Sequence, residues 1–363
     1  MSLPEGDFET IRKSLLGWFE SHKREMPWRD SRDPYAIWLS EVMLQQTRVD
    51  QATPYFQKFM AAYPKVTDLA EADQHDVLML WEGLGYYARG RNLHKAAKVV
   101  ANSHGGRFPA SYEELLKLPG VGPYTAAAIS SIAFGGKHAV VDGNVIRVLS
   151  RFFGITDDVS SGKTKRTIQE LADELLDPQK PGDFNQAVME LGSLVCSPTS
   201  PKCDECPIGA WCVAHKTLQT SAIPYKAPKS KVPHHDIVVA VISDNQGRLL
   251  IAKRPETAML GGLWEFPGGK VEHGETFEQA LIREIQEELG IQISIQREFM
   301  VLKHAYSHFK ITLHAYLCDH TGGTPEPRSS TELLWVLPHQ LADFPFPKAN
   351  RRLTLALMEQ LRG

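Results

Sequence analysis

Apolar residues recur at helical intervals through the first part of the chain. Four segments place apolar side chains three and four residues apart, with glycine or proline between them: 8–22, 34–63, 73–83 and 164–176. Such spacing gathers the apolar side chains on one face of each helix, where neighbouring helices can cover them. The pattern continues to about residue 212 and predicts an all-helical first domain over residues 1–220.

The pattern then changes twice. Residues 221–234 contain three prolines and three lysines, a composition typical of an extended linker. Beyond the linker, four segments have the β-branched or alternating side chains that predict strands: 236–244, 247–254, 293–302 and 309–319. Residues 245–247 predict a hairpin turn, and residues 276–289 predict one helix. We therefore expect residues 235–363 to form a second domain of the α+β class.

Composition places the chain among ordinary globular proteins. Its 363 residues, 42% of them hydrophobic and 23% charged, exceed what one core usually serves, which agrees with two domains. The formal net charge of −3 gives no general attraction for nucleic acid, so DNA binding would depend on local basic clusters and backbone N–H groups. The longest apolar stretches are shorter than the roughly 20 residues that span a bilayer, and the first residues lack a basic, apolar start. We expect a cytoplasmic protein.

Four of the five cysteines crowd into one short segment. Cys196, Cys203, Cys206 and Cys212 are separated by six, two and five residues. In a reducing compartment such crowding predicts a metal or cluster site rather than disulfides. Four thiolates at this spacing can hold either an iron-sulfur cluster or a tetrahedral zinc ion, because thiolates suit both. Cys318 stands apart in a predicted strand, and we interpret it as a buried apolar side chain.

A glycine-rich turn precedes a predicted helix at residues 118–134. Gly120 and Gly122 allow the backbone to approach a phosphate closely, and the free N–H groups at the start of the helix can bind an anion without net positive charge. Such a turn between two helices also occurs with no other role than to reverse the chain. Taken alone, the motif therefore leaves both interpretations open.

Two carboxylates stand in positions suited to acid and anion chemistry. Asp142 lies where an apolar run ends and a helix begins, so the helix dipole and nearby N–H groups should favour its ionised form. Glu41 lies in a helix with apolar neighbours on both sides, and partial burial there would raise its pKa. Such a pair can supply a proton and an anionic stabiliser to a breaking glycosidic bond. A plain helix cap for Asp142 and a solvated side chain for Glu41 are the alternatives.

The cysteine spacing and the glycine turn together resemble the endonuclease III superfamily of helix-hairpin-helix DNA glycosylases. The resemblance implies that the four cysteines hold a 4Fe-4S cluster, which keeps the loop 196–212 near DNA, and that residues 118–134 form the helix-hairpin-helix. Members that cut the DNA strand have a lysine at the position of Tyr124, and its amine forms a Schiff base. Tyrosine cannot form this bond, so the resemblance implies release of a base by hydrolysis alone, leaving an abasic site.

Within this superfamily, residues 40–47 resemble the MutY family of adenine DNA glycosylases, and the separate motifs agree in order over nearly the whole chain. The resemblance implies that Glu41 protonates the departing adenine at N7 and later helps to activate water. It also implies that Asp142 stabilises the cationic sugar. Tyr124 and Asn144 are expected to help place these groups.

The same resemblance identifies residues that contact DNA. Four of them match positions that line the adenine pocket of the family: Arg29, Leu44, Val49 and Gln186. Gln46 and Tyr86 match residues that enter the duplex at the flipped base, where an aromatic ring can fill the vacated stack. Thr47, at the end of the same motif, is grouped with the DNA-binding residues. Trp81 and Tyr87 lie near Tyr86 in the same segment. Each could either contact DNA or pack in the core, and we expect core packing for at least one of them.

The second domain contains a full match to the Nudix box of nucleotide hydrolases. The residues that fit the box are Gly269, Glu275, Arg283, Glu284, Ile285, Glu287, Glu288, Gly290 and Ile291. The predicted helix puts its three last glutamates three and four residues apart on one face, where carboxylates could hold magnesium. Hydrolysis of nucleoside diphosphate derivatives is therefore an alternative activity of this domain.

In the MutY family the equivalent domain recognises 8-oxoguanine in DNA. The segment Tyr306, Ser307 and His308 resembles the aromatic-Ser-His loop that the family uses for this purpose, with tyrosine in place of the commoner phenylalanine. A serine hydroxyl can contact the edge of the oxidised base while the aromatic ring lies beside it. Without the resemblance, Ser307 would be interpreted as an ordinary loop residue.

These observations predict an all-α helix-hairpin-helix glycosylase domain with an iron-sulfur loop, followed by an α+β Nudix-like domain. The expected function is that of a monofunctional adenine DNA glycosylase in base excision repair, acting on adenine opposite 8-oxoguanine or guanine. The expected cofactor is a 4Fe-4S cluster, the expected partner is duplex DNA, and the expected state is a monomer. A nucleotide pyrophosphohydrolase and a noncatalytic iron-sulfur DNA-binding protein are the alternatives, and Tyr124 with the two carboxylates favours the glycosylase over the latter.

Overall fold

The computed structural model describes residues 5–228, 232–306 and 309–360. It divides into two compact units, of which the first comprises Met1–Glu71 and Asn92–Lys229 and the second comprises Ala72–Arg91 and Ser230–Gly363. Among the described residues, none of the helices combines the length and the apolar character needed to cross a membrane.

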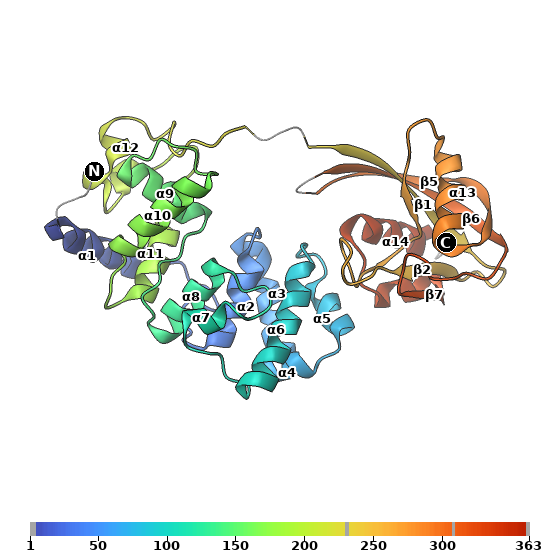
Figure 1. The fold of residues 1–363 in the computed structure, drawn as a ribbon, viewed down its shortest axis with the longest axis horizontal. Coiled ribbons are helices and arrows are strands. Elements are labelled where there is room, and N and C mark those ends of the chain that lie inside the picture. The colour runs from blue at the N-terminus through green and yellow to red at the C-terminus, as the bar shows by residue number, and fades with distance from the viewer. Residues whose placement is uncertain (1–4, 229–231, 307–308, 361–363) are drawn as a thin grey trace. The chain divides into compact units, whose positions relative to one another are not determined.

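Helices make up the first unit, as the periodicity predicts (Figure 1). The helices that lie wholly in this unit are α1 (Glu5–His22), α2 (Pro34–Leu44), α3 (Val49–Ala62), α4 (Val66–Glu71), α7 (Tyr112–Leu115), α8 (Pro123–Phe134), α9 (Gly143–Phe153), α10 (Gly162–Leu175), α11 (Pro181–Leu194) and α12 (Val213–Lys216). Two short 3-10 helices, η1 (Cys203–Glu205) and η2 (Gly209–Trp211), lie in the cysteine loop. Helix α5 (Gln74–Trp81) lies in the second unit, and α6 (Ala88–His104) begins there and continues into the first.

Three helices position the site of the first unit, and their ends are encoded locally. Asp33 caps α2 by accepting a hydrogen bond from the Tyr35 N–H, and Pro34 occupies the first turn, where its missing N–H costs nothing. Nine of the eleven residues of α2 are buried, so this helix runs through the interior rather than along the surface. Helix α8 ends at Gly135, which has the left-handed backbone (φ 73°) that favours glycine. Helix α9 begins at Asp142, which caps it.

The second unit is built on a mixed sheet of seven strands among the described residues, in the order β3-β2-β1-β6-β5, with β4 paired to β1 and β7 paired to β2. The strands are β1 (His234–Ser243), β2 (Leu249–Lys253), β3 (Trp264–Glu265), β4 (Gly268–Lys270), β5 (Gln292–Ala305), β6 (Lys310–Gly322) and β7 (Glu332–Val336). Strands β1 and β6 run parallel over ten residue pairs, and the other pairs are antiparallel.

Two helices cover opposite faces of this sheet (Figure 1). Along β1, Val238 and Ala240 point to the core beneath α13 (Phe277–Leu289), whereas Val239 and Val241 point to the core beneath α14 (Lys348–Gln360), as the two-residue period of a strand requires. Cys318 is buried in the α13 core, which confirms its interpretation as an apolar side chain. The fold class predicted from the sequence is confirmed.

Candidate active site

A cavity of about 650 Å³ opens in the first unit between α2, α8 and α11 and the start of α9. Nine of the residues predicted from the sequence line it: Arg29, Glu41, Leu44, Thr47, Val49, Tyr124, Asp142, Asn144 and Gln186. They come from segments up to 157 positions apart in the chain, as for Arg29 and Gln186. The structure therefore brings the predicted acid, the predicted anion and the predicted base-binding residues to one cavity.

Glu41 sits on the buried helix α2 and faces this cavity. The Tyr124 hydroxyl donates a hydrogen bond to Glu41 Oε2 at 2.5 Å. Burial raises the pKa of Glu41 to about 7, and the negative charge of Asp142 adds to the rise, while the bond from Tyr124 and the charge of Arg29 oppose it. The direction agrees with the expectation from the apolar neighbours of Glu41. This carboxyl group can therefore hold a proton close to neutral pH.

Asp142 is both the cap of α9 and a wall of the cavity. Its carboxylate accepts hydrogen bonds from Val145 N at 2.7 Å and from Asn144 Nδ2 at 3.0 Å. Burial nevertheless raises the pKa of Asp142, although these hydrogen bonds and the charge of Arg147 lower it. The local donors act in the direction that the sequence predicted, but removal from water in the cavity outweighs them, so the net shift of the Asp142 pKa is upward.

Asn144 connects this aspartate to the cysteine segment. Its Oδ1 accepts from Arg147 Nη2 at 2.8 Å, and Arg147 Nε donates to Cys196 O at 2.7 Å. A third bond runs from Arg147 Nη2 to Gly192 O at 2.7 Å. The side-chain amide of Asn144 is thus held at both its oxygen and its nitrogen, which orients the N–H that donates to Asp142.

The sequence missed Glu190, which organises the far wall of the cavity. It is 2% exposed and accepts from Arg29 Nη2 at 2.7 Å and from Arg24 Nε at 2.7 Å. Burial raises the pKa of Glu190, but the bonds from the two arginines outweigh it and bring the pKa below its ordinary value. Arg29 Nη1 also donates to Gln186 Oε1 at 2.9 Å. Glu190 follows Gln186 by four positions on α11, so a helical projection could have found it.

The glycine turn before α8 has the form that close backbone approach requires. Gly120 has φ +74°, and a Cβ there would come within 2.6 Å of the Asn92 side chain. Gly122 is the cap residue of α8 and makes no side-chain cap bond, and the space where its Cβ would lie is open. The open space beside Gly122 is compatible with the predicted approach of an anion to the start of α8.

The four predicted cysteine ligands surround one small cavity of about 30 Å³, which Arg151 also lines. Their side chains are half-buried and unoxidised, and Arg151 Nη1 lies 3.4 Å from Cys196 Sγ. Burial raises the pKa of Cys206 to about 12, so its thiolate would need a positive partner such as a metal. Four thiols and a guanidinium are a donor set that fits a thiolate-bound cluster. Among the described residues, no three His, Cys, Asp or Glu side chains form a ready-made group for a single metal ion.

The two predicted wedge residues share an unusual backbone. Gln46 (φ 59°) and Tyr86 (φ 48°) both adopt the left-handed region, which residues with a Cβ enter only under constraint. Tyr86 is 44% exposed, whereas Trp81 and Tyr87 are 0% and 4% exposed. Core packing is therefore the correct interpretation for both Trp81 and Tyr87, and Tyr86 is the aromatic residue of this segment that faces outward.

In the second unit, the box glutamates are tied to Arg283. Its guanidinium donates to Glu275 at 2.7 Å, to Glu284 at 3.0 Å and to Glu287 at 3.2 Å. A Cβ at Gly269 would lie 2.3 Å from Glu284 Cδ, so the Glu284 side chain would have to move if this residue were not glycine. Glu288, the third glutamate of the predicted magnesium site, instead accepts from Gly268 N at 3.1 Å and from Ser329 Oγ at 2.9 Å. Within the described part of the chain these carboxylates do not form a ready-made group for a metal ion.

The predicted 8-oxoguanine loop is described only at Tyr306. The Tyr306 ring stacks on Phe309 at 4.8 Å between centroids, and Tyr306 N donates to Phe309 O at 2.8 Å. Ser307 and His308 lie outside the described residues. Near this loop the sequence missed Glu265, which pairs with Arg254 at 2.6 Å and whose pKa burial raises to about 7.

Two family models match the chain: the HhH-GPD superfamily base excision DNA repair protein over residues 39–174, and the NUDIX domain over residues 238–356. The chain is 35% identical to the adenine DNA glycosylase of Mus musculus, covering 91% of this chain and 75% of that protein. It is 38% identical to the adenine DNA glycosylase of Homo sapiens, covering 87% and 68%.

Solved structures show the same fold for the helical part. A thermostable thymine-DNA glycosylase superimposes with a TM-score of 0.53 at 31% identity, over 58% of this chain and 98% of that one. An endonuclease III in a non-covalent DNA complex superimposes with a TM-score of 0.51 at 20% identity, over 60% and 99%, which shows the fold alone.

Proposed function

The chain belongs to the adenine DNA glycosylase family, and on this premise we propose that it hydrolyses the bond between adenine and deoxyribose where adenine lies opposite 8-oxoguanine or guanine in duplex DNA. The observation that supports the chemistry is the arrangement of Glu41, Tyr124 and Asp142 around one cavity. Enzymes that act on a base in a duplex rotate it out of the stack, and a cavity of about 650 Å³ is large enough to receive it.

Glu41 supplies the proton that adenine needs to leave. Burial raises the pKa of Glu41 to about 7, so a substantial fraction of this group is protonated near neutral pH. As the proton passes to adenine, the glycosidic bond breaks and its electron pair leaves with the base. The sugar becomes cationic, and the Asp142 carboxylate, held by Val145 N and Asn144 Nδ2, stabilises it in a site with little water. The Glu41 carboxylate then accepts a proton from the water that attacks the sugar.

Tyr124 limits the reaction to hydrolysis. Its hydroxyl is committed to Glu41 at 2.5 Å, and burial raises its pKa well above the ordinary value, so it is neither an amine nor an available phenolate. Without an amine at this position there is no Schiff base with the sugar and no route to strand cleavage through it. The product is an intact strand with an abasic site.

The four cysteines would hold a 4Fe-4S cluster in the loop between α11 and α12, which Arg147 and Arg151 of α9 contact. The second unit would contact the base opposite adenine through Tyr306, Ser307 and His308. The intact Nudix box keeps nucleotide pyrophosphohydrolysis as an alternative activity of that unit, for which a cation would have to displace Arg283 from Glu284 and Glu287.

One gel assay tests the main proposal. The full chain is incubated with a labelled duplex that holds adenine opposite 8-oxoguanine, and the product is divided and treated with or without alkali. Cleavage only after alkali supports base removal without strand scission. Cleavage without alkali contradicts the role of Tyr124, and an intact strand in both halves contradicts the glycosylase. Absorbance near 400 nm from the purified protein checks the cluster.

A further inference from the structure

The loop between α5 and α6 carries Tyr86, and its own side chains fold it into a fixed shape. Trp81 Nε1 donates to Gly85 O at 3.1 Å, and Arg89 N donates to Tyr86 O at 2.8 Å. The Arg89 guanidinium lies 5.4 Å from the ring centroids of both Trp81 and Tyr86. Tyr86 nevertheless has φ +48°, a conformation that a residue with a Cβ adopts only at an energetic cost. The surroundings must therefore fix it.

An ion pair at Glu82 ties the start of this loop to the C-terminal part of the same unit. Arg351, in the first turn of α14, donates through Nε to Glu82 Oε1 at 2.6 Å and through Nη2 to Oε2 at 2.5 Å. The same guanidinium donates to Leu341 O and Phe344 O. The side chains of Glu82 and Arg351 are 21% and 18% exposed. Because the pair has two hydrogen bonds and little exposure, it fixes both the distance between Glu82 and Arg351 and the orientation of the two side chains.

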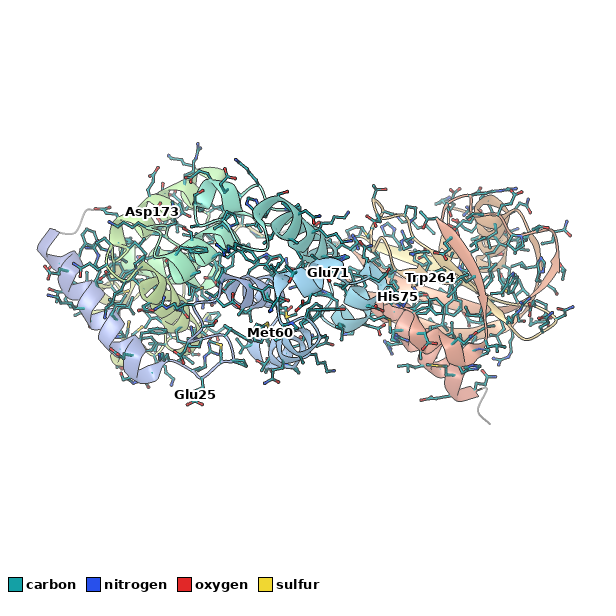
Figure 2. The ribbon with its side chains drawn as sticks, turned by 90° about the horizontal axis from the view of Figure 1, so that it is seen from below. Glu25, Met60, Glu71, His75, Asp173 and Trp264 are labelled. Carbon is teal, nitrogen blue, oxygen red and sulfur yellow. The ribbon has the colours of Figure 1, made fainter. Side chains whose placement is uncertain are left out.

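A second attachment lies at the other end of the loop. The Tyr87 hydroxyl donates to Phe346 O at 3.1 Å. Before the loop, in α5, His75 Nε2 lies 2.8 Å from Asp343 O. The rings of His75 and Trp264, which Figure 2 labels, both pack against Phe344. Glu82 and Tyr87 thus anchor the residues on both sides of Tyr86 to one short segment before and within α14.

We infer that Glu82 and Arg351 are positioning residues that hold Tyr86 in the backbone conformation from which its ring enters the duplex. The inference rests on the proposed function of Tyr86 as a wedge. It gives α14 a role in base flipping that is separate from any contact of the second unit with the opposite base. Loss of the pair removes the two strongest bonds to Glu82 and leaves the longer one from Phe346 N at 3.4 Å, together with the Trp81 and Arg89 contacts. The loop therefore stays folded but is held less tightly at its start, and it samples conformations in which the ring points elsewhere.

A double-mutant cycle on the full chain tests this inference. Single-turnover excision of adenine opposite 8-oxoguanine is measured for Arg351→Met, Tyr86→Ala and the double variant. We expect Arg351→Met to slow excision about tenfold and to add nothing in the Tyr86→Ala background, because both changes remove the same ordered wedge. Fluorescence of 2-aminopurine in place of the adenine should show reduced flipping for Arg351→Met. The matched control is Arg352→Met, which removes an exposed arginine at the next position of α14 and should behave as wild type.

Each outcome decides the matter. Additive effects in the cycle, or an Arg351→Met variant that matches the control, overturn the inference. If Arg351→Met lowers the melting temperature markedly, Glu82→Gln keeps the shape of the side chain and repeats the cycle without the charge. The exchange of Glu82→Arg with Arg351→Glu should restore at least part of the rate. A wild-type protein that leaves adenine in place would refute the proposed function, whereas an active wild type with an additive cycle refutes only the role of this pair.

Discussion

Glu41 in the first compact unit and Glu275 in the second show opposite shifts in pKa. In the first, burial raises the pKa of Glu41 to about 7, and a tyrosine hydroxyl is its hydrogen-bond donor. In the second, the hydrogen bonds from Arg283 lower the pKa of Glu275 to about 2. The residue type is the same, and the difference comes from what replaces water around it. A buried carboxyl beside a neutral donor keeps its proton, whereas a solvated carboxylate beside a guanidinium does not.

This contrast separates two kinds of chemistry. Release of adenine needs a group that can give up a proton near neutral pH, and Glu41 fits that need. Holding a divalent cation needs carboxylates that stay charged. The lowered pKa of Glu275 fits that need, whereas burial raises the pKa of Glu284. The glycosylase chemistry is therefore expected to fail when the first arrangement is altered and to survive when the second is.

The largest effect is expected from Glu41→Gln. The amide has no proton to give to adenine, so single-turnover excision opposite 8-oxoguanine should fall by about a thousandfold or more. Binding to the mismatched duplex, measured by gel shift, should stay close to wild type. Glu71→Gln, an exposed glutamate at the end of α4 that Figure 2 labels, is the matched control and should retain full activity. Normal turnover by Glu41→Gln would show that Glu41 is not the proton donor, and the contrast between Glu41 and Glu275 would then say nothing about the chemistry.

The second largest effect is expected from Asp142→Asn, which removes the negative charge of this residue while keeping its role as a helix cap. Asparagine can still accept the hydrogen bond from Val145 N, so α9 stays capped and the melting temperature should change little. Loss of the negative charge beside the cationic sugar should slow excision by about a hundredfold or more. A variant that excises normally, with its melting temperature intact, would show that Asp142 is a helix cap and nothing else.

A change of pH gives a smaller and more diagnostic effect. Excision needs protonated Glu41, and this form predominates below its pKa, so the rate should fall as pH rises through about 7. It should also fall at low pH, where Asp142, whose pKa burial raises, becomes protonated. Tyr124→Phe removes a hydrogen bond that lowers this pKa, so the falling limb should move to higher pH, with less than about a tenfold change in the maximal rate. A limb that stays in place, or moves to lower pH, would contradict the coupling between the two side chains.

The sequence predicted the elements and many residues of the site, and it failed where long-range packing decides. The burial of Glu41 follows from its apolar neighbours along α2, which are local information. The net shift of Asp142 depends on burial in a cavity whose walls come from distant helices, and local donors pointed to the opposite sign. A helical projection from Gln186 could have placed Glu190 on the cavity face of α11, but not its ion pair with Arg24, which lies 166 positions away.

The pattern of hydrophobic and polar residues also did not predict the backbone conformation of the wedge segment or the pairing of the strands. Gly83 and Gly85 flank Leu84 in the wedge segment and signal a turn, yet they do not tell which aromatic residue faces outward. Burial of Trp81 and Tyr87 settles this only once the chain is folded. Similarly, alternation predicted β1 and β6 as strands, but their parallel pairing joins residues 76 positions apart, as for His234 and Lys310.

The smallest effect on excision is expected from Glu284→Gln, which neutralises a carboxylate of the second unit and weakens one hydrogen bond from Arg283. Because Arg283 keeps its bonds to Glu275 and Glu287, the helix α13 should remain anchored. Excision of adenine should stay within about twofold of wild type. Release of pyrophosphate or phosphate from nucleoside triphosphates with Mg²⁺, if the wild type shows it, should disappear in this variant, since that reaction needs the charged oxygens. A fall in excision as deep as that of Glu41→Gln would mean that the carboxylates of both units serve one reaction, and the division drawn between them would be wrong.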